Sequence, residues 1–447
     1  MSSRTHEPLE RLLSFSQGIT LEWANQVGWA KERRWEGSEE GAQLSRFFPS
    51  LEGLWARGAQ ADPGEFGRTL SHTFNAIAVY NRILSRSFPE SGLSDPELEP
   101  VYRLSASLAQ ANPALMPLIL WLHDMGRLED KEHHPEKGAQ LIRELGLLQE
   151  IPLSPEAALL VTKVVESHLL VGTLYSGEIS FLGFSVLLND PELVPFLTDL
   201  SQRELFVEAL ILFTMIDVWA YPYNARAISA AMIGNYLQIA DELRSVLEKG
   251  DNLPEARQRL VTIAQKTTDW RLSCYLRAFS HIGTQPYLTS QFYQQKVIEG
   301  AGRYAQQPLS PEEWQSFKAA RLSKFHQIQF KYALGLLCLL SFRDLGRFRE
   351  GCTPTTQMNP QVFDLLTRIN GRIAQEESTL SLGPDRPWDV ILTGTPNWTR
   401  PIDLFDRLEE DPAAFQKIVD EGTVKPPREG KSPVLYLNFK PCWRYLD

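Results

Sequence analysis

Hydrophobic residues recur about every three to four positions through most of the first 250 residues, the spacing expected for one buried face of an α-helix. The pattern is clearest in residues 74–83, 115–122, 139–148, 157–170 and 204–219. Prolines lie between these stretches or in their first turns, where the missing N–H is tolerated. Because strands do not alternate with helices here, the pattern disfavours a parallel α/β sheet and predicts an all-α core.

The region before this core is expected to form short helices. Leu9, Leu12 and Leu13 have helical spacing, and four tryptophans add aromatic mass between residues 23 and 55. A turn-rich stretch, GAQADPGEFG at residues 58–67, closes the region. We therefore predict an N-terminal helical cap over residues 1–60 and a central helical domain over residues 61–250.

The C-terminal part begins after a linker candidate, GDNLP, at residues 250–254. The chain beyond it again has a helical pattern, and a long helical segment is expected from residue 311 to residue 348. The sequences WDVIL at 388–392 and VLYLNF at 434–439 predict strands, since they are short apolar runs set among proline and glycine. We expect a mostly helical C-terminal domain, residues 251–447, that ends in a few strands.

The composition of the 447-residue chain excludes several classes of protein. Hydrophobic residues make up 43% and charged residues 22%, which excludes a mainly disordered chain. With 45 basic and 55 acidic side chains the net charge is −10, which argues against a general nucleic-acid binder. We found neither an apolar run of about 18 residues nor an apolar signal core, so we expect a cytoplasmic protein without a membrane span.

The candidate chemistry lies in histidines and aspartates inside apolar helical runs. Five of the eight histidines lie between residues 72 and 168. His123 and Asp124 end the apolar helix PLILWL, and burying either group without a partner costs several kcal/mol. His72, His168 and Asp217 are likewise polar residues within apolar stretches. A divalent cation would provide the missing partner, because imidazole and carboxylate are both good metal ligands.

This ordered set resembles the HD superfamily of metal-dependent phosphohydrolases, in which a His, a His-Asp doublet and a distal Asp lie on helices of an all-α core. His72, His123, Asp124 and Asp217 match these four positions. Within the superfamily, the chain is most similar to the HD domains of the uridylyl-removing enzymes of nitrogen regulation. The shared motifs are L-H-D-x-x-(K/R), H-x-x-x-G-A and V-x-x-H-L-L, and the similarity covers about residues 68–245. The resemblance implies that the central domain is an HD domain.

The resemblance also implies a set of metal ligands, namely His72, His123, Asp124, His134, His168 and Asp217. Asp124 would bridge two ions, the second of which would be held by His134 and His168. The cofactor is then one or two divalent ions of manganese, iron, magnesium or zinc. Many relatives have a His-His pair where this chain has Ser167-His168, so the number of ions stays open.

Charged and ionisable residues near these ligands are candidates to act on a substrate. The predicted substrate-binding residues are Arg127, Lys131, Lys137 and Arg226, and the predicted catalytic residues are Asp124, Arg127, Asp130 and His133. Arg127 replaces the usual lysine and keeps a positive charge that can bind a phosphate through two hydrogen bonds. His133 or Asp130 could protonate the leaving group. The alternative for the loop residues is a solvated, purely structural face.

Aromatic residues directly after Asp217 are candidates for lining a pocket. They are Trp219, Tyr221 and Tyr223, and their alternative role is packing at the end of the helix.

The favoured function is metal-dependent hydrolysis of a phosphoester, with a nucleotide or a nucleotidylated molecule as the substrate. A metal-bound water would attack phosphorus after its pKa has been lowered by the ion. Two alternatives stay open. HD-type di-iron oxygenases use the same order of histidines and aspartates on small organic substrates, and a non-catalytic HD module would bind a nucleotide or a protein. A protein partner could also bind the C-terminal domain.

Overall fold

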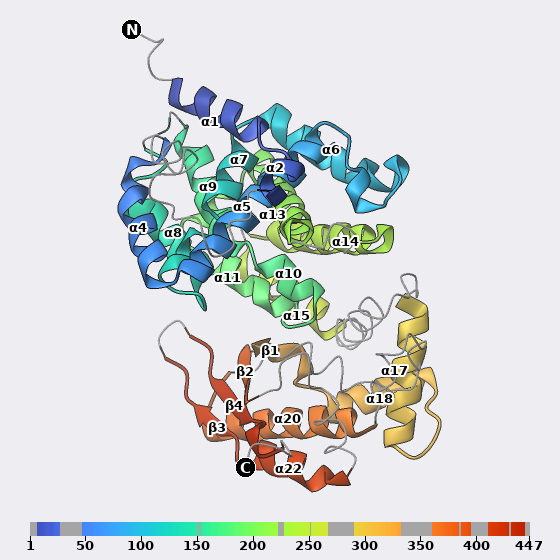
Figure 1. Ribbon diagram of the computed structural model, residues 1–447. Coiled ribbons are helices and arrows are strands. Elements are labelled where there is room, and N and C mark those ends of the chain that lie inside the picture. The colour runs from blue at the N-terminus through green and yellow to red at the C-terminus, as the bar shows by residue number, and fades with distance from the viewer. Residues whose placement is uncertain are drawn as a thin grey trace. The chain divides into compact units, whose positions relative to one another are not determined.

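The structure, a computed structural model, describes residues 7–26, 47–149, 151, 153–221, 228–250, 252–266, 290–331, 360–383, 386–394, 410–428 and 431–442. Over these residues the chain is mostly helical, as predicted (Figure 1). The chain divides into two compact units. Unit 1 lies within Met1–Gly172 and Asp190–Asp251, and unit 2 lies within Thr173–Asn189 and Asn252–Asp447.

Unit 1 is built from helices. The α-helices are α1 (Glu7–Gln17), α2 (Leu21–Gln26), α4 (Glu52–Ala61), α5 (Pro63–Leu84), α6 (Asp95–Ala111), α7 (Leu115–Leu122), α8 (His134–Glu144), α9 (Pro155–Ser167), α12 (Leu193–Phe196), α13 (Leu200–Ala220) and α14 (Ala230–Leu247). Short 3-10 helices are η1 (Pro49–Leu51), η2 (Pro89–Ser91) and η3 (Met125–Leu128). Helices α1, α2 and α4 all contact α5. These N-terminal helices therefore belong to the same compact unit as the central helices. The predicted domain boundary at residue 60 stays a prediction.

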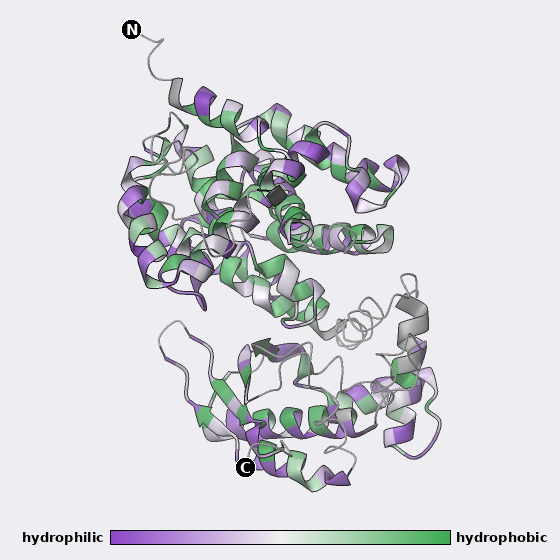
Figure 2. Cartoon of the chain, in the orientation of Figure 1, coloured by the Kyte–Doolittle hydropathy of each residue, from purple (hydrophilic) through white to green (hydrophobic). Residues whose placement is uncertain are grey.

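Helix α13 lies at the centre of unit 1. The Asp199 side chain caps its first turn by accepting hydrogen bonds from the backbone N–H groups of Ser201 and Gln202, at 2.8 and 3.1 Å. The helix is apolar over most of its length (Figure 2) and is largely buried. It contacts α5, α6, α7, α9 and α14. A helix that is hydrophobic nearly all round needs such neighbours on every side. Of these neighbours, α5 contains the candidate ligand His72, and α7 and α9 end at His123 and His168.

The helical run Pro155–Tyr175 combines α9 and α10 (Leu170–Tyr175). It is 21 residues long and includes an 18-residue stretch with a mean hydropathy of 1.5, so by length and composition it is apolar enough to cross a membrane. Core helices of globular proteins have the same properties, and α9 contacts α7, α8 and α13 within unit 1. The cytoplasmic location stays a prediction.

Unit 2 contains helices and one sheet. Its helices are η4 (Phe181–Phe184), α11 (Ser185–Leu188), α15 (Leu253–Lys266), α17 (Ser290–Tyr304), α18 (Pro311–Arg321), η5 (Phe325–Gln327), α20 (Pro360–Thr379), α22 (Pro412–Asp420) and η7 (Lys440–Cys442). Its strands are β1 (Ile328–Lys331), β2 (Trp388–Thr393), β3 (Thr423–Lys425) and β4 (Val434–Asn438).

The sheet has the order β1-β2-β4-β3. Strand β1 pairs parallel with β2, with Ile328 opposite Trp388, and β2 pairs parallel with β4, with Asp389 opposite Val434. The strands predicted at 388–392 and 434–439 are confirmed as β2 and β4. The helix predicted from 311 to 348 is wrong at two points, because α18 ends at Arg321 and residues 328–331 form β1. A strand of only four residues gives too short an alternation of buried and exposed positions to be recognised beside a helical pattern.

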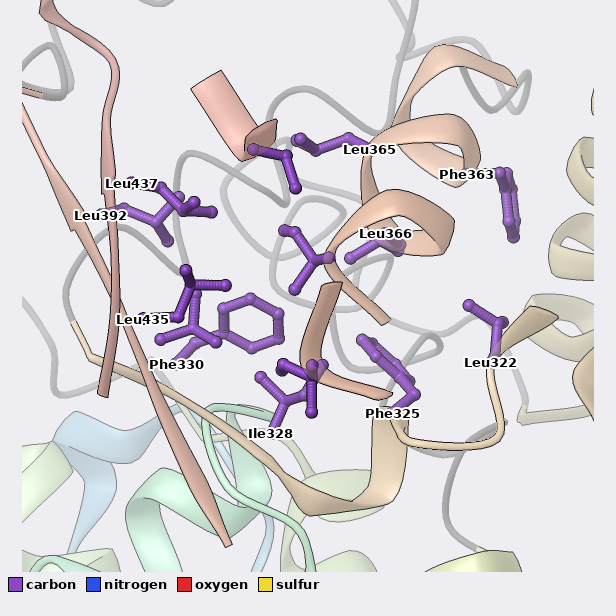
Figure 3. Packing of buried hydrophobic residues seen from close by; sticks show 14 of the residues in the cluster. Leu322, Phe325, Ile328, Phe330, Phe363, Leu365, Leu366, Leu392, Leu435 and Leu437 are labelled. Carbon is purple, nitrogen blue, oxygen red and sulfur yellow. The ribbon is translucent and has the colours of Figure 1, made fainter. Parts of the chain in front are cut away.

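The sheet and α20 enclose the core of unit 2. Leu392, Leu435 and Leu437 project from β2 and β4 toward Leu366 on α20, with Phe330 of β1 beside them (Figure 3). All five side chains are at most 2% exposed. Burying each of them removes apolar surface from water, which stabilises the fold by about 1.5–3 kcal/mol per side chain.

Truncating this core should destabilise the sheet. Val390→Ala, at a fully buried position of β2, should lower the free energy of opening by about 1.5–3 kcal/mol. The control is Val186→Ala on α11, where the side chain is 57% exposed and the change should stay within about 0.5 kcal/mol. Native-state hydrogen exchange of the β2 and β4 amides would measure the difference, and equal effects of the two substitutions would contradict the packing.

Candidate metal centre

The first part of the candidate centre joins α5 to α13. Helix α5 begins at Pro63, and the Asp62 side chain caps it by accepting a hydrogen bond from the backbone N–H of Glu65, at 2.9 Å. His72 follows on the buried face of this helix. Its Nε2 lies 2.6 Å from Oδ1 of Asp217, which α13 presents in its last turn. The two residues are 145 positions apart in sequence, so only the packing of α5 against α13 brings them together.

The second part of the centre lies where α7 ends. All side chains of α7 are buried, and His123 continues the helical conformation as its C-cap. Asp124 leaves that conformation (φ −101°, ψ 2°) and turns the chain into η3. His123 Nε2 lies 3.6 Å from Oδ2 of Asp124 and 3.9 Å from Oδ1 of Asp217. The doublet thus connects to the α5–α13 pair, as the ordered motif predicted.

Gly126 allows η3 to approach α8 closely. A Cβ atom at this position would lie 2.1 Å from the carbonyl oxygen of His134 and 2.6 Å from the backbone nitrogen of Gly138. Only a residue without a side chain fits there. The close approach places His134 Nε2 3.2 Å from Oδ1 of Asp124.

His134 and His168 complete the cluster. His134 is the first residue of α8, and His168 is the C-cap of α9. Their Nε2 atoms lie 3.2 Å apart, and His168 Nε2 lies 3.9 Å from Oδ1 of Asp124. Both rings are buried. Asp124 therefore offers Oδ2 toward His123 and Oδ1 toward His134 and His168.

Three imidazoles share one local hydrogen-bonding arrangement. The Nδ1 atoms of His123, His134 and His168 lie 2.9, 3.0 and 2.7 Å from the carbonyl oxygens of Leu120, Lys131 and Val165, each three residues earlier in the chain. A carbonyl oxygen only accepts, so each Nδ1 carries the proton and donates it. Each Nε2 of a neutral ring then bears a lone pair, and these lone pairs point toward Asp124.

This arrangement fits a bound cation. Two Nε2 lone pairs 3.2 Å apart repel one another unless a proton or a metal ion lies near them. His123 Nε2 is buried and, among the described residues, has no hydrogen-bond partner. Two groups of potential ligand atoms each lie within 4.8 Å of one another, His72 with His123 and Asp124, and Asp124 with His134 and His168. The predicted ligands can therefore hold a metal ion, and Asp124 belongs to both groups.

The pKa values match what a metal requires of its ligands. Burial lowers the pKa of His168 to about 3 and also lowers the pKa of His123, so both rings are neutral at pH 7. Burial opposes ionisation of Asp124, but the surrounding imidazoles, in their protonated form, hold the pKa of its carboxyl well below its ordinary value. Burial would lower the pKa of His72 too, but the hydrogen bond with Asp217 raises it above the ordinary value. A metal ion that enters between His72 and Asp217 would displace the proton of the hydrogen bond between them.

Glu65 is a residue near the centre that sequence reasoning missed. Its carboxylate is buried and pairs with Arg127 at 3.1 Å, with Lys131 at 3.0 Å and with Arg68. Arg127 Nε also lies 3.8 Å from Oδ2 of Asp124. The sequence did carry a signal, since Glu65 precedes His72 by seven residues, or two helical turns on the same face of α5.

The other predicted residues have other positions. Lys137 pairs with Glu129 at 2.9 Å rather than with a residue of the cluster. His133 and Asp130 pair with each other at 3.2 Å and are almost half exposed, so their role as proton donors stays a prediction. Arg226 and Tyr223 lie outside the described residues.

Two aromatic residues after Asp217 have different environments. Trp219 is buried and packs edge-on against Phe88, which is helix-end packing. The Tyr221 ring lies 4.3 Å from the His72 ring and is 45% exposed. Tyr221 therefore borders the centre on the side that faces solvent.

No family model matches the chain, and no curated protein or solved structure is significantly similar to it.

Metal content should follow the two ligand groups. The wild-type protein is expected to bind two divalent ions per chain, His168→Gln one, and Asp124→Asn none, because Asp124 belongs to both groups. The control is Asp241→Asn, an exposed carboxylate on α14 that pairs with Arg244 and should keep both ions. Elemental mass spectrometry after dialysis against each metal measures the content. Two ions retained by Asp124→Asn would contradict the shared carboxylate.

Gly126→Ala should separate η3 from α8 and so move His134 away from Asp124. We expect the loss of one ion per chain together with a destabilisation of about 1–3 kcal/mol from the steric conflict. Gly234→Ala on α14 is the matched control, since a Cβ there meets nothing within 4 Å and alanine favours a helix by about 1 kcal/mol. Metal content and thermal unfolding measure both effects. Unchanged metal content in Gly126→Ala would disprove this role of the glycine.

Proposed function

We propose that the protein is a metal-dependent phosphohydrolase that acts on a nucleotide or a nucleotidylated substrate. Two lines of reasoning support the proposal. The ordered residues resemble the HD superfamily, and the folded chain brings His72, His123, Asp124 and Asp217 close to one another. One observation carries the proposal. Asp124 belongs to both groups of potential metal ligands, and the Arg127 guanidinium lies 3.8 Å from its Oδ2.

Divalent ions at such a pair of groups would lower the pKa of a bound water and polarise a phosphoryl oxygen. The residues of the chain provide the remaining requirements. Asp124 orients both ligand groups, because its two oxygens face different histidines. The buried rings of His123, His134 and His168 exclude bulk water from one side of the centre. Where bulk water is excluded, electrostatic interactions that stabilise the charge developing in the transition state become stronger, and this favours hydrolysis by a bound water.

A substrate would approach from the side of His72 and Asp217. Asp217 has a side-chain exposure of 18% and Arg127 one of 29%, and the Tyr221 ring is more exposed still. Arg127 keeps a positive charge here at any physiological pH, and the carboxylates of Asp124 and Glu65 raise its pKa further although burial opposes them. Its guanidinium can donate to the phosphoryl oxygens and stabilise the charge that develops on them.

The proposal is tested by reconstituting the full-length protein with manganese, magnesium, zinc or iron separately. We expect phosphate or nucleotide release from a panel of nucleotides and nucleotidylated molecules with at least one metal. Asp124→Asn should lower kcat/KM by about a thousandfold or more, equivalent to ~4 kcal/mol of barrier. Asp241→Asn is the control and should keep full activity, because its carboxylate is exposed and pairs with Arg244.

Oxygen consumption measured in the same preparations separates the hydrolase from the competing di-iron oxygenase. The hydrolase releases phosphate without consuming oxygen. Oxygen uptake that requires two irons and is lost in Asp124→Asn would replace the proposal by the oxygenase. Full phosphohydrolase activity in Asp124→Asn would show that the reaction takes place elsewhere in the chain.

A further inference from the structure

Glu65 collects three cations beside the metal centre. Its Oε1 lies 3.1 Å from Arg127 Nη2, and its Oε2 lies 3.0 Å from Lys131 Nζ and also pairs with Arg68. The carboxylate is buried, with a side-chain exposure of 7%. Burial by itself opposes its ionisation, but the hydrogen bonds and charges of the three cations lower its pKa below the ordinary value. Glu65 thus fixes three flexible basic side chains around one point.

Besides Glu65, two acids pair with this group. Asp62 lies 3.4 Å from Lys131 and is 56% exposed, and Asp124 lies 3.8 Å from Arg127. A cation bound at the metal centre would neutralise the charge of Asp124, which would leave Glu65 and Asp62 opposite three basic side chains. Arg68 and Lys131 have side-chain exposures of 71% and 51%, so a ligand in solution can reach them. Arginine has five N–H donors and lysine three, so donors are left for an anion.

The position of the group relates it to the proposed reaction. Arg127 connects the two regions, since it binds Glu65 and lies 3.8 Å from Oδ2 of Asp124. Glu65 and His72 are seven residues apart on one face of α5, a rise of about 10 Å along the helix. Arg127 therefore lies beside the metal cluster, and Glu65 connects it to Lys131 and Arg68.

We propose that Arg68, Arg127 and Lys131 bind a second phosphate group of the substrate and that Glu65 positions them. This inference rests on the proposed function and narrows it to substrates with two or more linked phosphoryl groups, such as nucleoside diphosphates or triphosphates. One phosphoryl group lies at the metal cluster and the next contacts the three cations. Charge-assisted hydrogen bonds from guanidinium and ammonium groups to phosphate are strong and, for arginine, directional. Lys137, which pairs with Glu129, lies outside this group.

The test measures binding of two non-hydrolysable probes to the full-length, metal-loaded protein at constant free metal. Methylphosphonate carries one phosphonate group and methylenediphosphonate carries two. Titration calorimetry should show at least about tenfold tighter binding of the second probe to the wild type. Arg68→Gln and Lys131→Met should each reduce this preference several-fold and leave both metal content and methylphosphonate binding unchanged. Glu65→Gln should reduce it as well, because the cations lose their common anchor.

Arg57→Gln is the matched control. Arg57 is 69% exposed, much like Arg68, but it pairs with Glu129 at 3.6 Å, so the preference should persist in this variant. A wild type that holds its metals but binds both probes equally would overturn the inference and leave the proposed function standing. Equal losses in Arg57→Gln and Arg68→Gln would also overturn it, since they would indicate a general effect of surface charge. A protein that binds neither metal nor either probe would remove both proposals.

Discussion

The hydrogen bonds from three histidine Nδ1 atoms to backbone carbonyls determine how the candidate centre is organised. In each case the acceptor lies three residues earlier, and for His123 and His168 it lies in the last turn of a helix. Carbonyls in the last turn lack a partner within the helix, so a ring that follows the helix can satisfy them. The same bond fixes the tautomer and turns the Nε2 lone pair toward Asp124. Without this constraint the rings could rotate, and the cluster would lose its ligand geometry.

Packing then holds the rings in place. Phe213 of the buried helix α13 contacts both His123 and His168, with ring centroids 5.0 and 5.4 Å apart and edge-on geometry. A ligand supported by a rigid apolar neighbour keeps its orientation when no metal is bound. Gly126 contributes differently, because the absence of its side chain lets His134 come within reach of Asp124. The centre thus depends on three kinds of local chemistry: a helix end, an aromatic contact and a glycine.

The sequence was sufficient for part of this description. Histidines and aspartates inside or at the end of apolar helices are unusual enough to identify His72, His123, Asp124, His168 and Asp217, and the structure brings these residues together. Two strands were predicted from short apolar runs among proline and glycine, whereas β1 and β3 were missed because they comprise only four and three residues. Glu65 escaped notice because an acid in the first turn of a helix is common. Lys131 and Lys137 look alike in sequence, and only the folded chain separates them, through Glu65 and Glu129.

The most direct test of the account is a crystal structure of the manganese- or iron-loaded protein with anomalous data collected at the metal edge. We expect two anomalous peaks about 3.5–4 Å apart, one on each side of the Asp124 carboxylate. The ion at one peak should be coordinated by His72, His123 and Asp217, and the ion at the other by His134 and His168. Peaks at other residues, or an Asp124 carboxylate that contacts neither ion, would contradict the account.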